Sequence, residues 1–119
     1  PLWFFPRKAA VEEAKLQEAM AMNELHHQQY ALNKTIHNHR LKIQQLQNQL
    51  NYLRNNALKS AGILINTIQS QYEKENIEYY EYLEGMSTAN DIKLKYLKVL
   101  NEYNQEIIRL NRYYSRSWD

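Results

Sequence analysis

Turn-forming residues are nearly absent from this chain, and no other feature constrains its fold as strongly. After Pro6 the sequence has no proline, and its only glycines are Gly62 and Gly85. A β-rich protein of 119 residues needs many more turn residues than this. We therefore predict an all-α protein.

Charge and composition argue against several functional classes. The 15 basic and 13 acidic residues are interspersed and give a formal net charge of +2, whereas nucleic-acid-binding proteins usually carry a clustered basic excess. The chain has no cysteine, so neither a disulfide nor a thiolate metal site can form. No stretch approaches the ~20 apolar residues of a membrane-spanning helix. The start at Pro1 indicates a fragment or a processed product.

The spacing of apolar residues predicts a long antiparallel helical hairpin followed by a C-terminal helix. Residues 1–6 are apolar, aromatic and bounded by prolines, and we expect an extended entry or a disordered terminus there. Helix formers follow, and we expect the hairpin to span residues 7–71 with its tip near 36–40. The predicted tip consists of Ile36, His37, Asn38, His39 and Arg40.

The clearest coiled-coil pattern lies in the second arm of the predicted hairpin. Apolar residues recur there at steps of three or four, and most residues between them are Gln or Asn. The seam consists of Ile43, Leu46, Leu50, Leu53, Ala57, Ala61, Leu64 and Ile68. A shorter seam in the first arm consists of Ala14, Ala21, Leu25, Leu32 and Ile36. Each seam requires a partner helix to cover it.

The seam loses its phase over residues 72–79, which predicts a break between helices. The predicted break comprises Lys74, Glu75, Asn76, Ile77 and Glu78, of which Asn76 and Ile77 are poor helix formers. We expect the C-terminal helix over residues 80–119, with a frayed end. Tyr72, Tyr79, Tyr80 and Tyr82 surround the break. They either line a channel or docking groove or pack the break, and packing is the preferred interpretation.

No residue pattern predicts catalysis. The serines lack a glycine-rich nucleophile motif, no phosphate-binding loop is present, and Glu12–Glu13 fits a solvated helix face. The histidines lack the four-residue spacing of helical metal ligands, so solvated polar residues are the better interpretation. They are His26, His27, His37 and His39. We therefore expect no enzymatic activity, no cofactor and no metal site.

An ordered set of segments resembles the TolC-like outer-membrane efflux proteins, most closely their heavy-metal cation branch. In that family an aromatic residue precedes a short glycine-containing break, an acidic–Ile pair and a Tyr-x-Glu-Tyr-Leu helix start. Residues 72–85 are similar to this order, residues 92–108 resemble the family's final helix, and residues 1–5 resemble its passage from a β-barrel strand into a periplasmic helix. The family usually has glycine where Glu75 stands. Because a positive φ is costly for Glu, we expect Asn76 to adopt it instead.

The resemblance implies an architecture, a location and partners. The chain would be part of the C-terminal half of a homotrimeric channel in a Gram-negative bacterium, with the periplasmic α-barrel fold. It would form the passive conduit wall of a tripartite, metal-cation efflux pump. The channel would be held in the outer membrane by a β-barrel outside this sequence. The predicted tip would bind a periplasmic adaptor protein linked to an inner-membrane pump, and residues 72–79 would lie in the equatorial region.

Two other functions fit the same helical pattern. The chain could be the α-helical hairpin of a periplasmic adaptor protein, although the third helix and the aromatic entry disfavour this. It could also be a free-standing coiled-coil scaffold without a transport role, which should form a defined soluble oligomer.

Overall fold

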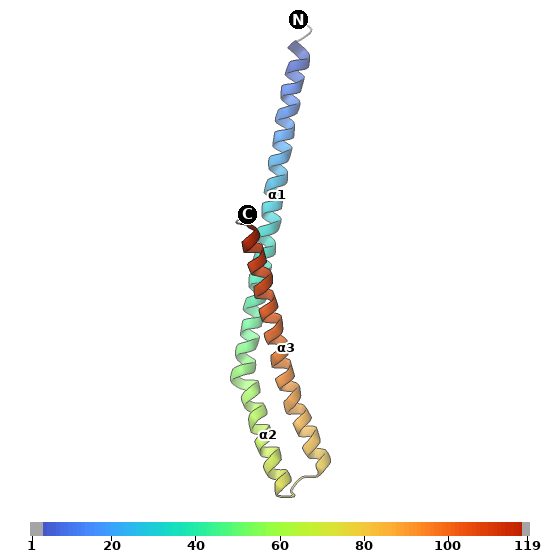
Figure 1. Ribbon diagram of the computed structural model, residues 1–119, viewed down its shortest axis with the longest axis vertical. Helices are drawn as coiled ribbons and strands as arrows, with labels where there is room; N and C mark the ends of the chain where they lie inside the picture. The colour runs from blue at the N-terminus through green and yellow to red at the C-terminus, as the bar shows by residue number, and fades with distance from the viewer. Residues whose placement is uncertain (1–3, 118–119) are drawn as a thin grey trace. The chain divides into compact units, whose positions relative to one another are not determined.

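The computed structural model describes the backbone of residues 4–117 and the side chains of residues 6–116. Four helical elements follow one another: α1 (Phe4–Tyr52), the π-helix η1 (Leu53–Ala57), α2 (Leu58–Glu73) and α3 (Tyr79–Ser117), as Figure 1 shows. The described residues contain no strand, and the all-α prediction is confirmed.

The predicted extended entry differs from the structure. Residues 1–3 lie outside the described residues, but Phe4, Phe5 and Pro6 already belong to α1. Pro6 is tolerated there because the first turn of a helix does not use its backbone N–H groups, and the fixed φ of proline suits a helix. The expectation of an extended segment is therefore wrong for residues 4–6.

The chain divides into two compact units, Pro1–Asn38 and His39–Asp119. In the first unit, every side chain from residue 6 to residue 34 is exposed. Between Ala14 and Leu32, no described residue covers the seam predicted for this stretch. Large apolar side chains such as Leu16 and Leu25 are 61% and 53% exposed.

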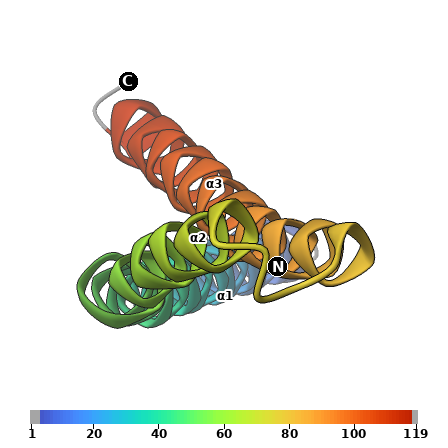
Figure 2. The same cartoon turned by 90° about the horizontal axis from the view of Figure 1, so that it is seen from below.

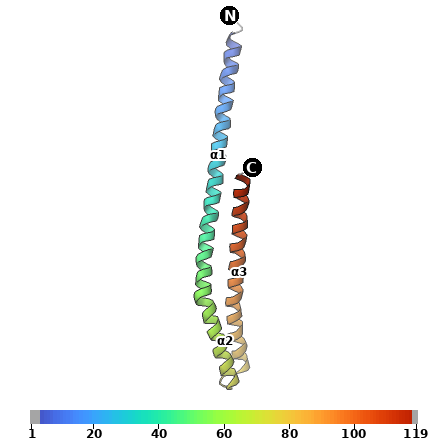
Figure 3. The same ribbon diagram turned by 60° about the vertical axis from the view of Figure 1, so that its left-hand side comes forward.

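In the second unit, α3 returns antiparallel along the preceding helices. His39 contacts Glu106, Arg54 contacts Tyr96, and Ile68 lies against Gly85. As residue numbers increase from His39 to Ile68, the numbers of their contact residues on α3 decrease from 106 to 85. Figures 1 and 3 show α2 and α3 side by side. Figure 2 views their short connection from the end.

The hairpin predicted over residues 7–71 is wrong. α1 continues without interruption through residues 36–40, which contain neither proline nor glycine to stop it. The seam from Ile43 to Ile68 packs against α3. The chain turns after Glu73, within the predicted break.

The core of the second unit follows this seam. Leu46, Leu50 and Leu53 are buried against Val99, and Ala57, Tyr96, Leu100 and Tyr103 pack around them. Nearer the turn, Ala61 and Ala89 have no exposed surface, and Ile68 is 9% exposed. Ile43 and Leu64 are half-buried. Small side chains at Ala61, Gly85 and Ala89 allow α2 and α3 to approach closely.

The π-helix η1 was not expected from the sequence. It lies where Leu53, Ala57 and Ala61 follow one another at two successive steps of four. One turn is widened there, and the Leu58 N–H accordingly donates to the Leu53 carbonyl oxygen. Leu53, Ala61 and Ile68 are all buried, so the seam stays on the covered face on both sides of η1.

Candidate functional site

The predicted tip residues lie inside α1 and do not form an end of the hairpin. His37, Asn38 and Arg40 are exposed, whereas Ile36 and His39 are half-buried. Only His39 and Arg40 belong to the second unit, where both meet α3. The Arg40 guanidinium lies 5.4 Å from the centroid of the Tyr114 ring, and the His39 ring lies 5.3 Å from that of Tyr113.

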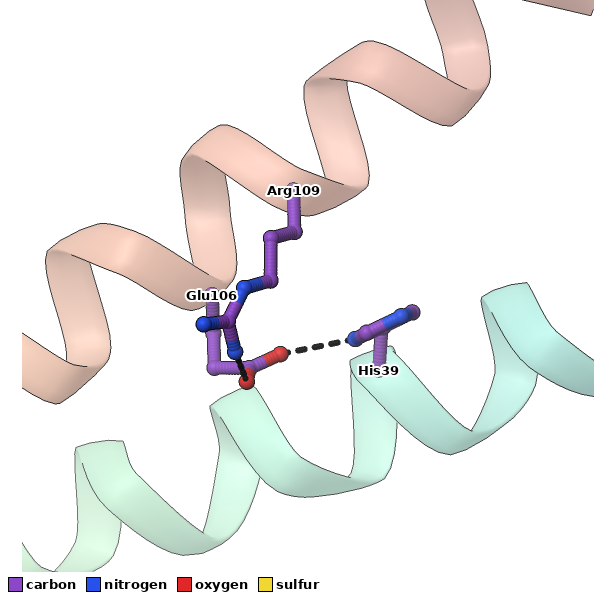
Figure 4. Close-up of polar contacts among 3 residues, drawn as sticks. All are labelled: His39, Glu106 and Arg109. Carbon is purple, nitrogen blue, oxygen red and sulfur yellow. Dashed lines mark hydrogen bonds and ion pairs between the residues drawn. The ribbon is translucent and has the colours of Figure 1, made fainter.

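A partly buried ionic cluster joins α1 to α3 at this position, and Figure 4 shows its three side chains. His39 Nδ1 lies 2.7 Å from Glu106 Oε2, and Arg109 Nη1 donates to Glu106 Oε1 at 2.7 Å. Because a carboxylate can only accept, the His39 proton must sit on Nδ1. Each carboxylate oxygen thus has its own donor in a site where the Glu106 side chain is 11% exposed. We call these three residues the clasp.

The clasp fixes the ionisation of Glu106. Burial alone would raise the pKa of Glu106, but hydrogen bonds and positive charge from His39 and Arg109 outweigh it and lower that pKa below its ordinary value. Glu106 is therefore a carboxylate at neutral pH and is no source of protons for acid catalysis. Its contacts are those of a structural ion pair that joins α1 to α3.

Sequence reasoning did not identify Glu106 or Arg109. One signal was available: Glu106 falls on the covered face of α3, in step with Val99, Tyr103 and Leu110. A carboxylate at such a position requires a donor from the facing helix. The identity of that donor, His39, depends on the pairing of α1 with α3.

The predicted break at residues 74–78 is present and ends α2 in a Schellman motif. The Asn76 N–H donates to the Gln71 carbonyl at 2.9 Å, and the Glu75 N–H donates to the Tyr72 carbonyl at 3.0 Å. Glu75 has a φ of 60°, so the expectation that Asn76 adopts the positive φ is wrong. Asn76 instead donates from Nδ2 to Gln71 Oε1 at 2.9 Å.

Three of the four tyrosines near the break pack together beside the turn. The Tyr72 and Tyr82 rings stack with centroids 4.7 Å apart, and the Tyr79 ring lies 6.2 Å from Tyr72 and 6.3 Å from Tyr82. This arrangement agrees with the packing interpretation for these rings. Tyr80 is 72% exposed.

Two other kinds of site are absent from the described part of the chain. No three or more His, Cys, Asp or Glu side chains there are placed to hold a metal ion. None of the described helices combines the length and the apolar character needed to cross a membrane.

Comparisons with known proteins do not add a relative. A scan against protein-family models and searches among curated proteins and solved structures found no match to the chain.

Proposed function

We propose that the chain is a non-catalytic wall element of a TolC-like outer-membrane efflux conduit. The observation that carries the proposal is the backbone of Glu75. The family usually has glycine at the position of Glu75, and this residue has a φ of 60°, the region that favours glycine. A positive φ at that residue supports the alignment of residues 72–85 with the family's break.

The helices have dimensions that suit a conduit wall. With a rise of ~1.5 Å per residue, α1 and α3 are about 75 Å and 60 Å long. The exposed side of α1 before η1 is rich in amides, including Gln44, Gln47, Asn48 and Gln49. Such a surface can face water or a lumen without burying unsatisfied polar groups.

The proposal retains a homotrimer, a periplasmic adaptor protein and an inner-membrane pump as partners. An adaptor contact at residues 36–40 would involve the side of a continuous helix, through the exposed His37, Asn38 and Arg40. The exported substrate would be a metal cation selected by the pump, while the conduit itself is passive.

A free-standing coiled-coil scaffold is the second candidate. One observation favours it: the seam from Ile43 to Ile68 is covered by α3 of the same chain. The hairpin core therefore closes without neighbouring subunits.

Fractionation of the native host separates the two candidates. An antibody against this chain should detect a polypeptide longer than 14.4 kDa in the outer-membrane fraction, and a bifunctional crosslinker should convert it to a trimer. A soluble product of 14.4 kDa would contradict the conduit and leave the scaffold. An unrelated outer-membrane protein and a soluble periplasmic protein serve as fraction controls.

A further inference from the structure

α3 carries a second apolar stripe on the side facing away from α1 and α2. Its large members are Leu83, Leu94, Leu97 and Ile108, which are 46%, 62%, 57% and 51% exposed. They are separated by 11, 3 and 11 residues, which places them on one helical face. The residues that α3 buries, such as Ala89 and Val99, lie on the opposite face. The stripe is therefore an uncovered coiled-coil seam.

The order of apolar and polar residues along the stripe is nearly the same in both directions of the helix. Between its apolar members lie Ser87, Asn90, Asn101 and Asn104, all exposed. In an antiparallel pair of α3 helices centred between residues 95 and 96, Leu83 faces Ile108 and Leu94 faces Leu97. In the same register Ser87 faces Asn104, and Asn90 faces Asn101. Every layer is then apolar on both sides or polar on both sides, and facing amides fix the register of such helices.

Charges beside the stripe favour the same arrangement. Asp91 and Lys98 occupy equivalent flanking positions in successive heptads, and antiparallel pairing brings Asp91 next to Lys98 of the other helix. A two-fold axis makes this contact twice. Neither side chain forms an ion pair within the described residues. In a parallel pair, Lys93 would instead face Lys98 of the other helix, a repulsive contact.

A hollow on α3 marks where one end of the stripe can seat a side chain. It is lined by Gln105, Ile108, Arg109 and Arg112. In the antiparallel register, Leu83 of a second helix falls on this hollow. Glu84, which follows Leu83, then lies beside Gln105.

We propose that the occupant of this stripe is a second copy of the chain, bound α3 to α3 in antiparallel orientation about a two-fold axis. The stripe is complementary to itself in apolar pattern, amide pattern and charge, which is what a closed, isologous dimer requires. The proposal uses the outer face of α3 alone. An antiparallel pair places the two copies in opposite directions, whereas the subunits of a homotrimeric conduit run in the same direction. The proposal therefore does not rest on the conduit and agrees with the scaffold candidate.

Sedimentation equilibrium of the 119-residue chain over a range of concentrations tests the pairing. We expect a monomer–dimer equilibrium, and we expect L94E/L97E to weaken it by at least about 100-fold because two central apolar layers are lost. The matched control L16E/L25E alters exposed leucines of α1 and should leave the dimer unchanged. Helical circular dichroism checks that all variants fold. A monomer at every concentration, or a dimer lost in L16E/L25E but kept in L94E/L97E, would overturn the proposal.

Charge exchange and crosslinking test the orientation. We expect D91K and K98E each to weaken the dimer about tenfold or more, and D91K/K98E together to restore it, since the pair is then re-formed with its signs exchanged. The chain has no native cysteine, so L83C and I108C provide clean labels. Oxidation of a mixture should join L83C to I108C, whereas neither variant alone should crosslink. Crosslinked L83C homodimers would show a parallel pair and refute the proposed register.

Discussion

The two glycines provide a sharp test of how closely α2 and α3 approach. A Cβ atom added at Gly85 would overlap Ile68 Cδ1 and lie 3.1 Å from Ile68 Cγ1, whereas one added at Gly62 would meet nothing within 4 Å. Both glycines lie inside helices. Replacing either with alanine should therefore give the same helix-propensity gain of ~1 kcal/mol.

The difference between the effects of G85A and G62A on the free energy of unfolding then measures the packing at Gly85 alone. G62A should stabilise the hairpin by about 1 kcal/mol. G85A should lose that gain to overpacking, which typically costs ~1–3 kcal/mol, and should be neutral or destabilising by up to ~2 kcal/mol. Ile68 is only 9% exposed, so its side chain has little room to move aside.

Urea unfolding followed by circular dichroism at 222 nm gives both free energies of unfolding. I68V removes the overlapping Cδ1 atom, so it should recover about 1 kcal/mol of the G85A loss in a double-mutant cycle. Equal stabilisation by G85A and G62A would refute the close approach of α2 and α3. Additive effects of I68V and G85A would show that the contact does not exist.

The core, the turn and the clasp can each be tested by a single substitution. L50A should destabilise the hairpin by ~2–5 kcal/mol, because Leu50 is only 5% exposed in the core. L25A alters a site that is 53% exposed and should change the free energy of unfolding in urea by less than about 0.5 kcal/mol. Equal effects of the two substitutions would contradict the assigned core. E75G should stabilise the folded hairpin by about 1 kcal/mol, because glycine adopts the positive φ of this position without strain. Thermal unfolding measures this change. A loss of stability would argue against a left-handed conformation at residue 75. Because the pKa of Glu106 is lowered in the folded state, its charge stabilises the fold above the ordinary carboxyl pKa, and this stabilisation is lost as pH falls through the lowered pKa. Wild type should therefore lose more stability than E106Q as pH falls from about 5 to about 2. Parallel pH profiles of the two proteins would contradict a charged clasp.

Local patterns predicted the helical fold class, the seam and the break, because each depends on residues close in sequence. Leu46, Leu50, Leu53 and Ile68 are buried as their spacing indicates. The break after Glu73 follows from lost phase and poor helix formers. These features require no knowledge of which helix packs on which.

The predicted tip failed because a partner choice is non-local. Residues 36–40 are weak helix formers, but weak propensity without proline or glycine does not stop a helix that is held by packing on one side. The competing partner, α3, covers the seam from Ile43 to Ile68. Sequence spacing alone could not decide whether the first arm or α3 covers this seam.

The clasp could not be predicted from the sequence for the same reason. His39 precedes Ile43 by one seam step and Glu106 follows Tyr103 by another, but 67 residues separate the two side chains. Their contact is set by the register of the hairpin.

The position of the chain reversal underlies the whole account, and a distance measurement tests it most directly. Pulsed electron–electron resonance on spin labels at the exposed Asn51 and Glu102 should give a distance below about 25 Å, because packed helices lie ~8–10 Å apart. Labels at the exposed Lys42 and Glu73, which both lie on the side of the hairpin that faces α3, should give no such short distance. The absence of a short distance between Asn51 and Glu102 would contradict the reversal at residues 74–78.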